Sequence, residues 1–182
     1  TEPAHEETVD VTANGQRLLS PAGLDDLAAC YAANPDAVLV AGATDVGLWV
    51  TKEHRKLETI IHLGRVRELQ ILQRDAGKLT IGAGVTYSDA MAAIVEIFPD
   101  FGEMIRRIGA VQVRNAGTIG GNIANASPIG DTPPALIVLD ATLVMRKGQG
   151  RRRLPIEEFF LDNDQQDRAP GEFLEAVEIP IP

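Results

Sequence analysis

Asn115–Pro134, which reads NAGTIGGNIANASPIGDTPP, is the stretch from which the rest of this 182-residue chain is interpreted. Its apolar residues follow neither the period of a strand nor that of an amphipathic helix, so the pattern predicts a long, tight loop. Glycine at this density lets a backbone come close to a ligand, and exposed N–H groups beside short polar side chains suit an anion such as a phosphate. The alternative is a surface loop that binds nothing. The small and polar residues of the stretch are Gly117, Thr118, Gly120, Gly121, Asn122, Asn125, Ser127, Gly130 and Asp131.

A second small-residue turn, Gly42-Ala43-Thr44-Asp45, stands between the apolar run Ala37–Ala41 and the apolar stretch Val46–Val50. This order predicts a buried strand, a turn and the start of a helix, which Thr44 or Asp45 could cap. A helix that begins behind such a turn can bind an anion through its free N–H groups. An ordinary capped turn explains the residues equally well. The turn matches neither the Walker loop nor the dinucleotide-binding glycine pattern.

Short predicted strands alternate with predicted helices along the chain, which indicates an α/β or α+β fold. The two small-residue segments lie roughly 75 residues apart, which suggests a cleft between two small subdomains. We divide the chain into a linker or disordered tail over residues 1–8, a first subdomain over residues 9–110 and a second subdomain over residues 111–182.

The chain is acidic, with 26 Asp and Glu residues, 17 Lys and Arg residues and a net charge of −9. This balance argues against nucleic acid as a partner, so Arg151-Arg152-Arg153 is interpreted as the solvated edge of a hairpin. Cys30 is the only cysteine, which excludes a cysteine-based zinc or iron–sulfur site within this chain, and no histidines have metal-ligand spacing. No apolar run is long enough for a membrane span, and residues 1–10 do not resemble a signal peptide, so a cytoplasmic location is expected.

No catalytic constellation is visible in the sequence. Ser127 lacks the Gly-x-Ser-x-Gly context of a hydrolase nucleophile, and no histidine is placed as its base. The carboxylates form no recognisable pair for glycoside hydrolysis or metal binding. We therefore expect no catalytic residue and no metal ligand, but a bound cofactor that carries the reactivity.

Two segments together resemble a known family. Leu39–Gly47 and Gly117–Asp131, in this order, are similar to the FAD-binding domain of molybdenum hydroxylases, the family of xanthine dehydrogenase, aldehyde oxidase and the carbon monoxide dehydrogenase flavoprotein. The likeness continues through Ile81–Ser88, Leu154–Phe160 and Glu175–Pro180, and it points to xanthine dehydrogenase in particular. It implies two α/β subdomains with FAD bound between them.

The resemblance also implies roles by position. Leu39–Val46 would line the FAD diphosphate, and Thr118–Asn122 would wrap the diphosphate and ribityl from the other side. Asp131 would hydrogen-bond the sugar–ribityl region, and Leu174 would pack near the isoalloxazine ring. Ile108 falls where xanthine dehydrogenases often place an aromatic residue against the flavin. The full set of implied FAD-binding residues is Leu39, Val40, Ala41, Gly42, Ala43, Thr44, Asp45, Val46, Ile108, Thr118, Ile119, Gly120, Gly121, Asn122, Asn125, Asp131 and Leu174.

The function implied by the resemblance is an electron relay. Substrate would be hydroxylated at a molybdenum cofactor on another domain or subunit, and electrons would reach FAD through iron–sulfur clusters that also lie elsewhere. Reduced flavin would then pass electrons to NAD or to dioxygen. The family continues into a further domain, so the chain is expected to be one flavin domain of a larger oxidoreductase. The alternative is a non-enzymatic nucleotide-binding or assembly domain that does not hold FAD productively.

Overall fold

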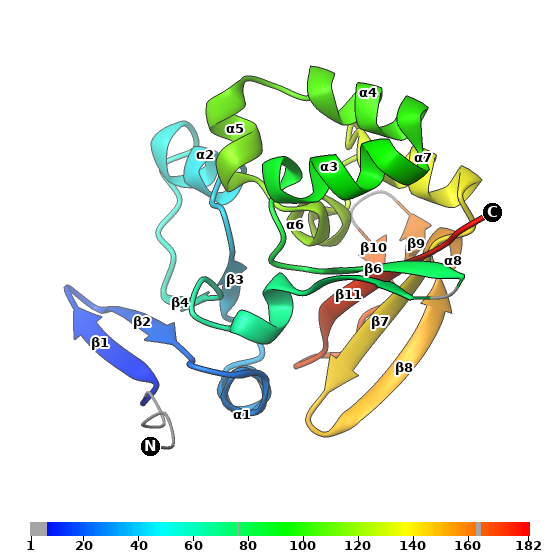
Figure 1. The fold of residues 1–182 in the computed structure, drawn as a ribbon. Helices are drawn as coiled ribbons and strands as arrows, with labels where there is room; N and C mark the ends of the chain where they lie inside the picture. The colour runs from blue at the N-terminus through cyan, green and yellow to red at the C-terminus, as the bar shows by residue number, and fades with distance from the viewer. Residues whose placement is uncertain (1–6, 76, 163–164) are drawn as a thin grey trace, which may run out of the picture.

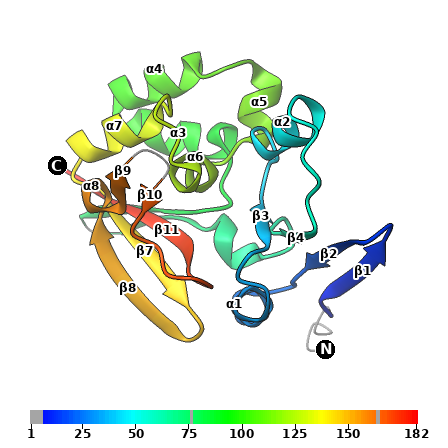
Figure 2. The same cartoon turned by 180° about the vertical axis from the view of Figure 1, so that it is seen from behind.

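A computed structural model of the chain describes residues 7–75, 77–162 and 165–182. It combines two main β-sheets with a group of helices (Figures 1 and 2), and the predicted mixed α/β class is confirmed. Of the predicted tail over residues 1–8, residues 1–6 lie outside the described part of the chain.

The first sheet has four strands in the order β1-β2-β4-β3. β1 and β2 form a hairpin whose turn residues Asn14 and Gly15 have φ angles of 53° and 74°. An Asn-Gly pair adopts this left-handed conformation readily, which favours a two-residue hairpin turn. β2 and β3 both pair in parallel with β4. The bounds in this part are β1 Val9–Ala13, β2 Gln16–Ser20, α1 Leu24–Ala33, β3 Val38–Val40, α2 Val46–Thr51 and β4 Thr59–His62.

The second sheet is antiparallel, with five strands in the order β5-β6-β11-β7-β8. Its central strand, β11, follows all its neighbours in the sequence. A separate antiparallel pair is formed by β9 and β10. The bounds are η1 Arg67–Gln70, a 3₁₀-helix, β5 Leu72–Asp75, β6 Lys78–Gly82, β7 Thr142–Lys147, β8 Gly150–Pro155, α8 Ile156–Phe159, β9 Phe160–Asp162, β10 Gln165–Gln166 and β11 Phe173–Pro180.

Five helices between β6 and β7 lie on one side of the second sheet (Figures 1 and 2). The last three occupy most of Asn115–Pro134, so the prediction of a long loop there is wrong. Contacts with distant segments, described below, stabilise helical turns in this glycine-rich stretch, which its sequence pattern does not predict. The bounds are α3 Tyr87–Ile97, α4 Pro99–Arg107, α5 Val111–Ala116, α6 Ile119–Asn125 and α7 Thr132–Val138.

One contiguous apolar core joins both sheets and the helices. Leu27 of α1, Ile61 of β4, Ile81 of β6, Ile123 of α6 and Phe159 of α8 are all fully buried members of it. Burying each side chain of this size stabilises the fold by about 1.5–3 kcal/mol. The two sheets therefore pack as parts of one folded body.

The division into subdomains at residues 110 and 111 stays a prediction. Strand pairing favours another division, between β4 and β5, because β5 and β6 belong to the same sheet as β7, β8 and β11. On this view the first part of the chain builds the first, mixed sheet, and the remainder builds the antiparallel sheet and its helices.

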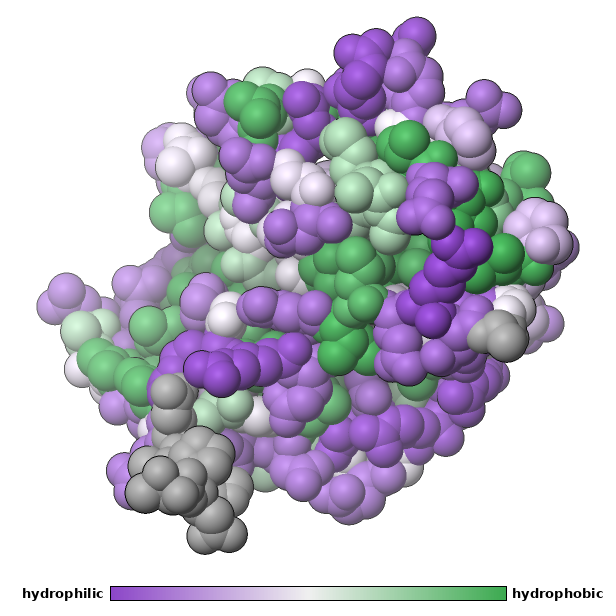
Figure 3. All heavy atoms as spheres, in the orientation of Figure 1, coloured by the Kyte–Doolittle hydropathy of each residue, from purple (hydrophilic) through white to green (hydrophobic). Residues whose placement is uncertain are grey.

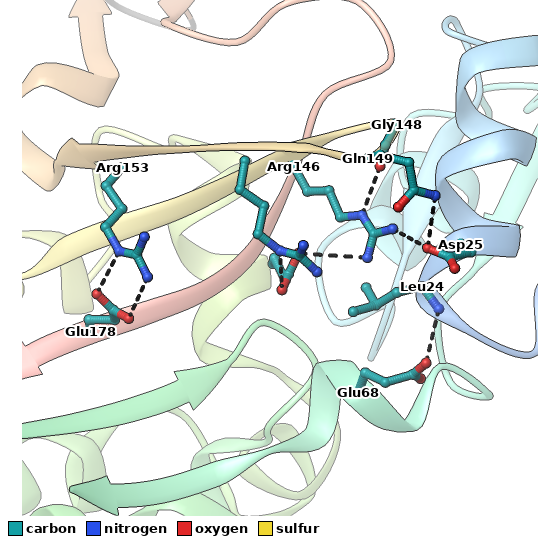
Figure 4. A network of polar contacts seen from close by, with 10 residues as sticks. Leu24, Asp25, Glu68, Arg146, Gly148, Gln149, Arg153 and Glu178 are labelled. Carbon is teal, nitrogen blue, oxygen red and sulfur yellow. Dashed lines mark hydrogen bonds and ion pairs between the residues drawn. The ribbon is translucent and has the colours of Figure 1, made fainter.

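Arginines on β7 and β8 are joined to carboxylates. Figure 4 shows the pair Arg153–Glu178 and the contacts of Arg146, whose side chain donates to Asp25 of α1 and to the carbonyl of Gly148. Arg146 is 2% exposed, so it links α1 to the second sheet from within the protein. The surface over β7 and β8 is mostly hydrophilic (Figure 3). Arg151 and Arg153 are exposed on β8, an outer strand of its sheet, which confirms the interpretation of a solvated hairpin edge for these two residues. Arg152 is half-buried and pairs with Glu172 and Asp167 instead.

Candidate FAD-binding site

The turn between β3 and α2 leaves a row of backbone donors open. In the described part of the chain, no acceptor takes a hydrogen bond from the N–H groups of Gly42, Ala43, Thr44 or Asp45. Ala43 has a φ of 56°, a left-handed conformation that helps successive N–H groups converge on one side. Ala43 and Thr44 are exposed. This turn therefore has the features of an anion-binding loop.

Side-chain capping does not account for the polar residues of this turn. Asp45 occupies the N-cap position of α2, but neither it nor Thr44 forms a side-chain cap hydrogen bond. The prediction that one of them caps the helix is therefore wrong. Gly42 has a packing role, since a Cβ there would lie 1.6 Å from the carbonyl oxygen of Ala116. Only glycine permits this approach between the turn and the end of α5.

The start of α6 forms the opposite wall. The hydroxyl of Thr118 accepts a hydrogen bond from the N–H of Gly121 at 2.9 Å and caps the helix. Backbone hydrogen bonds from Tyr87 N–H to the Gly117 carbonyl and from Ile119 N–H to the Val85 carbonyl join this start to the beginning of α3 and the segment before it. These bonds fix the position of α6 against the second sheet.

Glycines of α6 have two different surroundings. A Cβ on Gly120 would lie 2.4 Å from Cα of Ala83, so this glycine allows α6 to pack closely against the end of β6. Gly121 is exposed instead, and a Cβ there would meet only Thr118, with the hydroxyl at 2.7 Å. Gly120 thus allows close packing of α6 on the end of β6, whereas Gly121 leaves the backbone of α6 exposed to a ligand.

Between these walls lies a cavity of about 510 Å³. It brings together segments that lie far apart in sequence, as the two glycine-rich segments predicted. Whether the lining residues contact FAD stays a prediction. The predicted site residues that line the cavity are Leu39, Ala41, Gly42, Ala43, Thr44, Asp45, Val46, Ile108, Thr118, Gly120, Gly121, Asn122, Asn125 and Leu174.

Three predicted residues are not among those that line the cavity. Val40 and Ile119 are buried at 9% and 0% exposure, so their side chains serve the core. Asp131 is exposed at the N-cap of α7 and forms no cap hydrogen bond. Next to it, the N–H and hydroxyl of Thr132 donate to Asn122 and tie α7 to α6.

Aromatic and charged residues that sequence reasoning missed also line the cavity, among them Tyr31, Trp49, Tyr87, Arg168 and Phe173. Trp49 could have been found, because it follows the small-residue turn by one helical turn. Tyr31 and Arg168 are 137 positions apart in sequence, and only the fold brings them together. No local pattern signals such a pair.

Among the residues that the structure describes, two charged ones line the cavity, Asp45 and Arg168. Tyr87 is buried among these elements, and burial is the main reason that its pKa is raised, to about 12. Its phenol therefore stays protonated at neutral pH. Within the described residues, no group of three or more His, Cys, Asp or Glu side chains is placed to hold a metal ion. The arrangement suits binding of an extended, partly anionic molecule.

Comparison with known proteins agrees with this site. Residues 13–182 match the family described as the FAD binding domain in molybdopterin dehydrogenase. The chain belongs to this family, and its cofactor is FAD. The resemblance seen in the sequence is thereby confirmed.

Relatives include whole enzymes and separate subunits. The chain is 30% identical to xanthine dehydrogenase/oxidase of Gallus gallus, over 97% of this chain and 14% of that protein. It is also 30% identical to the nicotinate dehydrogenase FAD-subunit of Eubacterium barkeri, over 67% of this chain and 42% of that subunit. Among solved structures, quinoline 2-oxidoreductase of Pseudomonas putida 86 superposes with a TM-score of 0.84 and 28% identity, over 90% of this chain and 58% of that one. The chain thus spans less than half the length of these two sequence relatives.

The residues present fit FAD. Four open N–H groups in the β3–α2 turn can satisfy diphosphate oxygens, which suits a chain whose net charge is −9. Exposed Gly121 lets the cofactor approach α6 closely. The lining beyond these donors is largely apolar and aromatic, which suits flat ring systems.

Proposed function

We propose that the chain is the flavin domain of a molybdenum hydroxylase that resembles xanthine dehydrogenase. In this role it takes electrons from iron–sulfur clusters, which like the molybdenum cofactor lie on other domains or subunits, and delivers them to NAD or dioxygen. The family supports a component of an oxidoreductase. The choice of acceptor, the hydroxylated substrate and the assembly partners belong to the proposal.

The observation that carries the proposal is the row of open N–H groups from Gly42 to Asp45 opposite the start of α6, both on one cavity. Bound FAD supplies the redox chemistry. The β3–α2 turn and α6 would hold its diphosphate, and the apolar walls would hold its rings. No side chain of the cavity needs to transfer a proton, in keeping with the raised pKa of Tyr87.

A domain that binds nucleotides without redox activity is the alternative. Such a domain would hold a nucleotide in the same cavity without passing electrons. Within the described residues, no helix is long and apolar enough to cross a membrane. Cytoplasmic location remains part of the proposal.

The test is to add FAD to the purified chain, remove unbound cofactor and record the visible absorption. Under the proposal, the chain retains the bands of oxidised flavin, dithionite bleaches them, and NAD or air restores them. A chain that stays colourless after FAD is added would contradict the proposal. Retained flavin that cannot be reduced and reoxidised would favour the non-enzymatic alternative.

A further inference from the structure

Arg168 is held beside the cavity by a rigid backbone segment. Its neighbour Asp167 accepts a hydrogen bond from Arg152 at 2.7 Å, and Arg152 also donates to Glu172 at 2.8 Å. The N–H of Ala169 donates to the same Glu172 carboxylate at 3.0 Å. Glu172 is 5% exposed, so this network is anchored in the protein. The backbone around Arg168 is therefore fixed without any ligand.

The guanidinium of Arg168 is positioned but not neutralised. Its Nη1 donates to the hydroxyl of Tyr31 at 2.6 Å and to the carbonyl of Glu172 at 3.4 Å. Its Cζ lies 5.9 Å from the centre of the Tyr31 ring. Across the described ranges, no carboxylate forms an ion pair with Arg168, and Nε and Nη2 have no acceptor. An arginine with free donors beside a cavity is available to a ligand.

The lining of the cavity has two unlike parts. The first consists of the buried side chains of Tyr31, Phe173 and Leu174. These residues come together because Gly171, two positions before Phe173, packs against Tyr31 and its neighbour Ala32. The second part is more open, with Trp49 and Ile108, which are half-buried, and Val113, which is 38% exposed.

The two halves of FAD make different demands on these parts. The isoalloxazine ring must exchange electrons with other groups, so it belongs beside the more open part, whereas the adenylate half is redox-inert and can lie against the buried part. The residues of the β3–α2 turn line the same cavity, and their open N–H groups suit the diphosphate that joins the halves. Arg168 is itself exposed, but it donates to Tyr31 and therefore stands beside the buried part.

We propose that Arg168 binds the adenylate half of FAD and makes the site selective for FAD over FMN. This inference rests on the proposed function, because it assumes that the cavity holds a flavin. Tyr31 is a positioning residue that orients the guanidinium. The proposal also moves Leu174 from the isoalloxazine ring, where the resemblance placed it, to the adenylate half.

The experiment compares the binding of FAD and FMN to the apo chain and to Arg168→Leu by titration calorimetry. We expect the variant to bind FAD about tenfold more weakly, because it loses charge-assisted hydrogen bonds, and to bind FMN as the original chain does. Tyr31→Phe should show the same selective loss for FAD to a smaller extent. The thermal unfolding midpoint of each variant establishes that it is folded.

Arg74→Leu is the matched control, because it removes an exposed arginine that pairs with Glu96 away from the cavity. It should leave both affinities unchanged. Equal weakening of FAD and FMN in Arg168→Leu, or no weakening of either, would overturn the inference alone. An original chain that binds neither flavin would overturn the proposed function, and this inference with it.

Discussion

Gly121 is the residue where the backbone of α6 is most directly open to a ligand. Substitution by valine places a Cβ 2.7 Å from the Thr118 hydroxyl and covers the exposed backbone. We expect the Gly121→Val chain to bind FAD at least about tenfold more weakly, and to lose about 1 kcal/mol of stability as the cap is disturbed. Flavin fluorescence titration and urea unfolding measure the two effects.

Gly47→Ala is the control for this variant. A Cβ on Gly47 has nothing within 4 Å, although Gly47 lies in α2, beside the same site. FAD affinity should therefore be unchanged in this variant. Undiminished flavin binding in Gly121→Val would show that α6 does not face the cofactor.

Most of the predicted site residues line the cavity, because the sequence marks two contiguous segments with small side chains. The sequence did not show which side chains within these segments point into the core and not toward the cavity. Val40 and Ile119 stand within these segments but turn into the core. It also missed Arg168, because its relation to Tyr31 is created by the packing of the segment before β11 against α1.

β7 carries the most buried of the charged links between elements. Arg146 joins this strand to Asp25 on α1 while its side chain is only 3% exposed. We expect Arg146→Leu to lower the free energy of unfolding by about 2 kcal/mol, because the half-buried Gly148 carbonyl loses a charged donor and the buried link from β7 to α1 is lost. Urea denaturation measures the change.

Arg153→Leu is the comparison for Arg146→Leu. Arg153 is on the adjacent strand, and its side chain is 60% exposed. An exposed ion pair contributes under about 1 kcal/mol, so this variant should unfold nearly as the original chain does. Equal losses in the two variants would contradict the role assigned to Arg146.

Among the elements, the hairpin β1–β2 could be predicted from the sequence, whereas the helix α6 could not. Asn14-Gly15 is a strong local turn signal for the hairpin. α6 was not within reach, because Gly120 and Gly121 lower helix propensity. Its helical form depends on the Thr118 cap and on the contacts with Val85 and Ala83.

Across the whole molecule, the free energy of unfolding should decrease in acid, because ionised carboxylates of the folded protein form ion pairs and hydrogen bonds with arginines and lysines. Burial alone would raise the pKa of Glu172, but hydrogen bonds from Arg152 and the Ala169 N–H hold it below its usual 4.5. In Glu178, Arg153 and Lys78 likewise outweigh the effect of burial. A folded-state pKa below the unfolded one stabilises the fold above about pH 4.5, and this contribution is lost as the pH falls further.

Arg152→Met tests this dependence. Without its partner, buried Glu172 should acquire a raised pKa, and the free energy of unfolding should fall by about 2 kcal/mol at pH 7. The difference from the original chain should shrink between pH 5 and pH 3, where protonation relieves the unpaired charge. Urea unfolding of the variant and the original chain between pH 3 and pH 5 measures this difference in free energy. Arg74→Met, which removes an exposed arginine, is the control. A difference that does not vary with pH would contradict the assignment.

The place of β11 at the centre of the antiparallel sheet has a consequence for how the protein is made. Ribosomes release the chain from its N-terminus, so β6 and β7 emerge well before the strand that joins them. Until β11 inserts, neither strand has its second partner, and Phe173 and Leu174 are missing from the cavity wall. The site is therefore incomplete until β11 has emerged, and we expect FAD to be acquired only after that point.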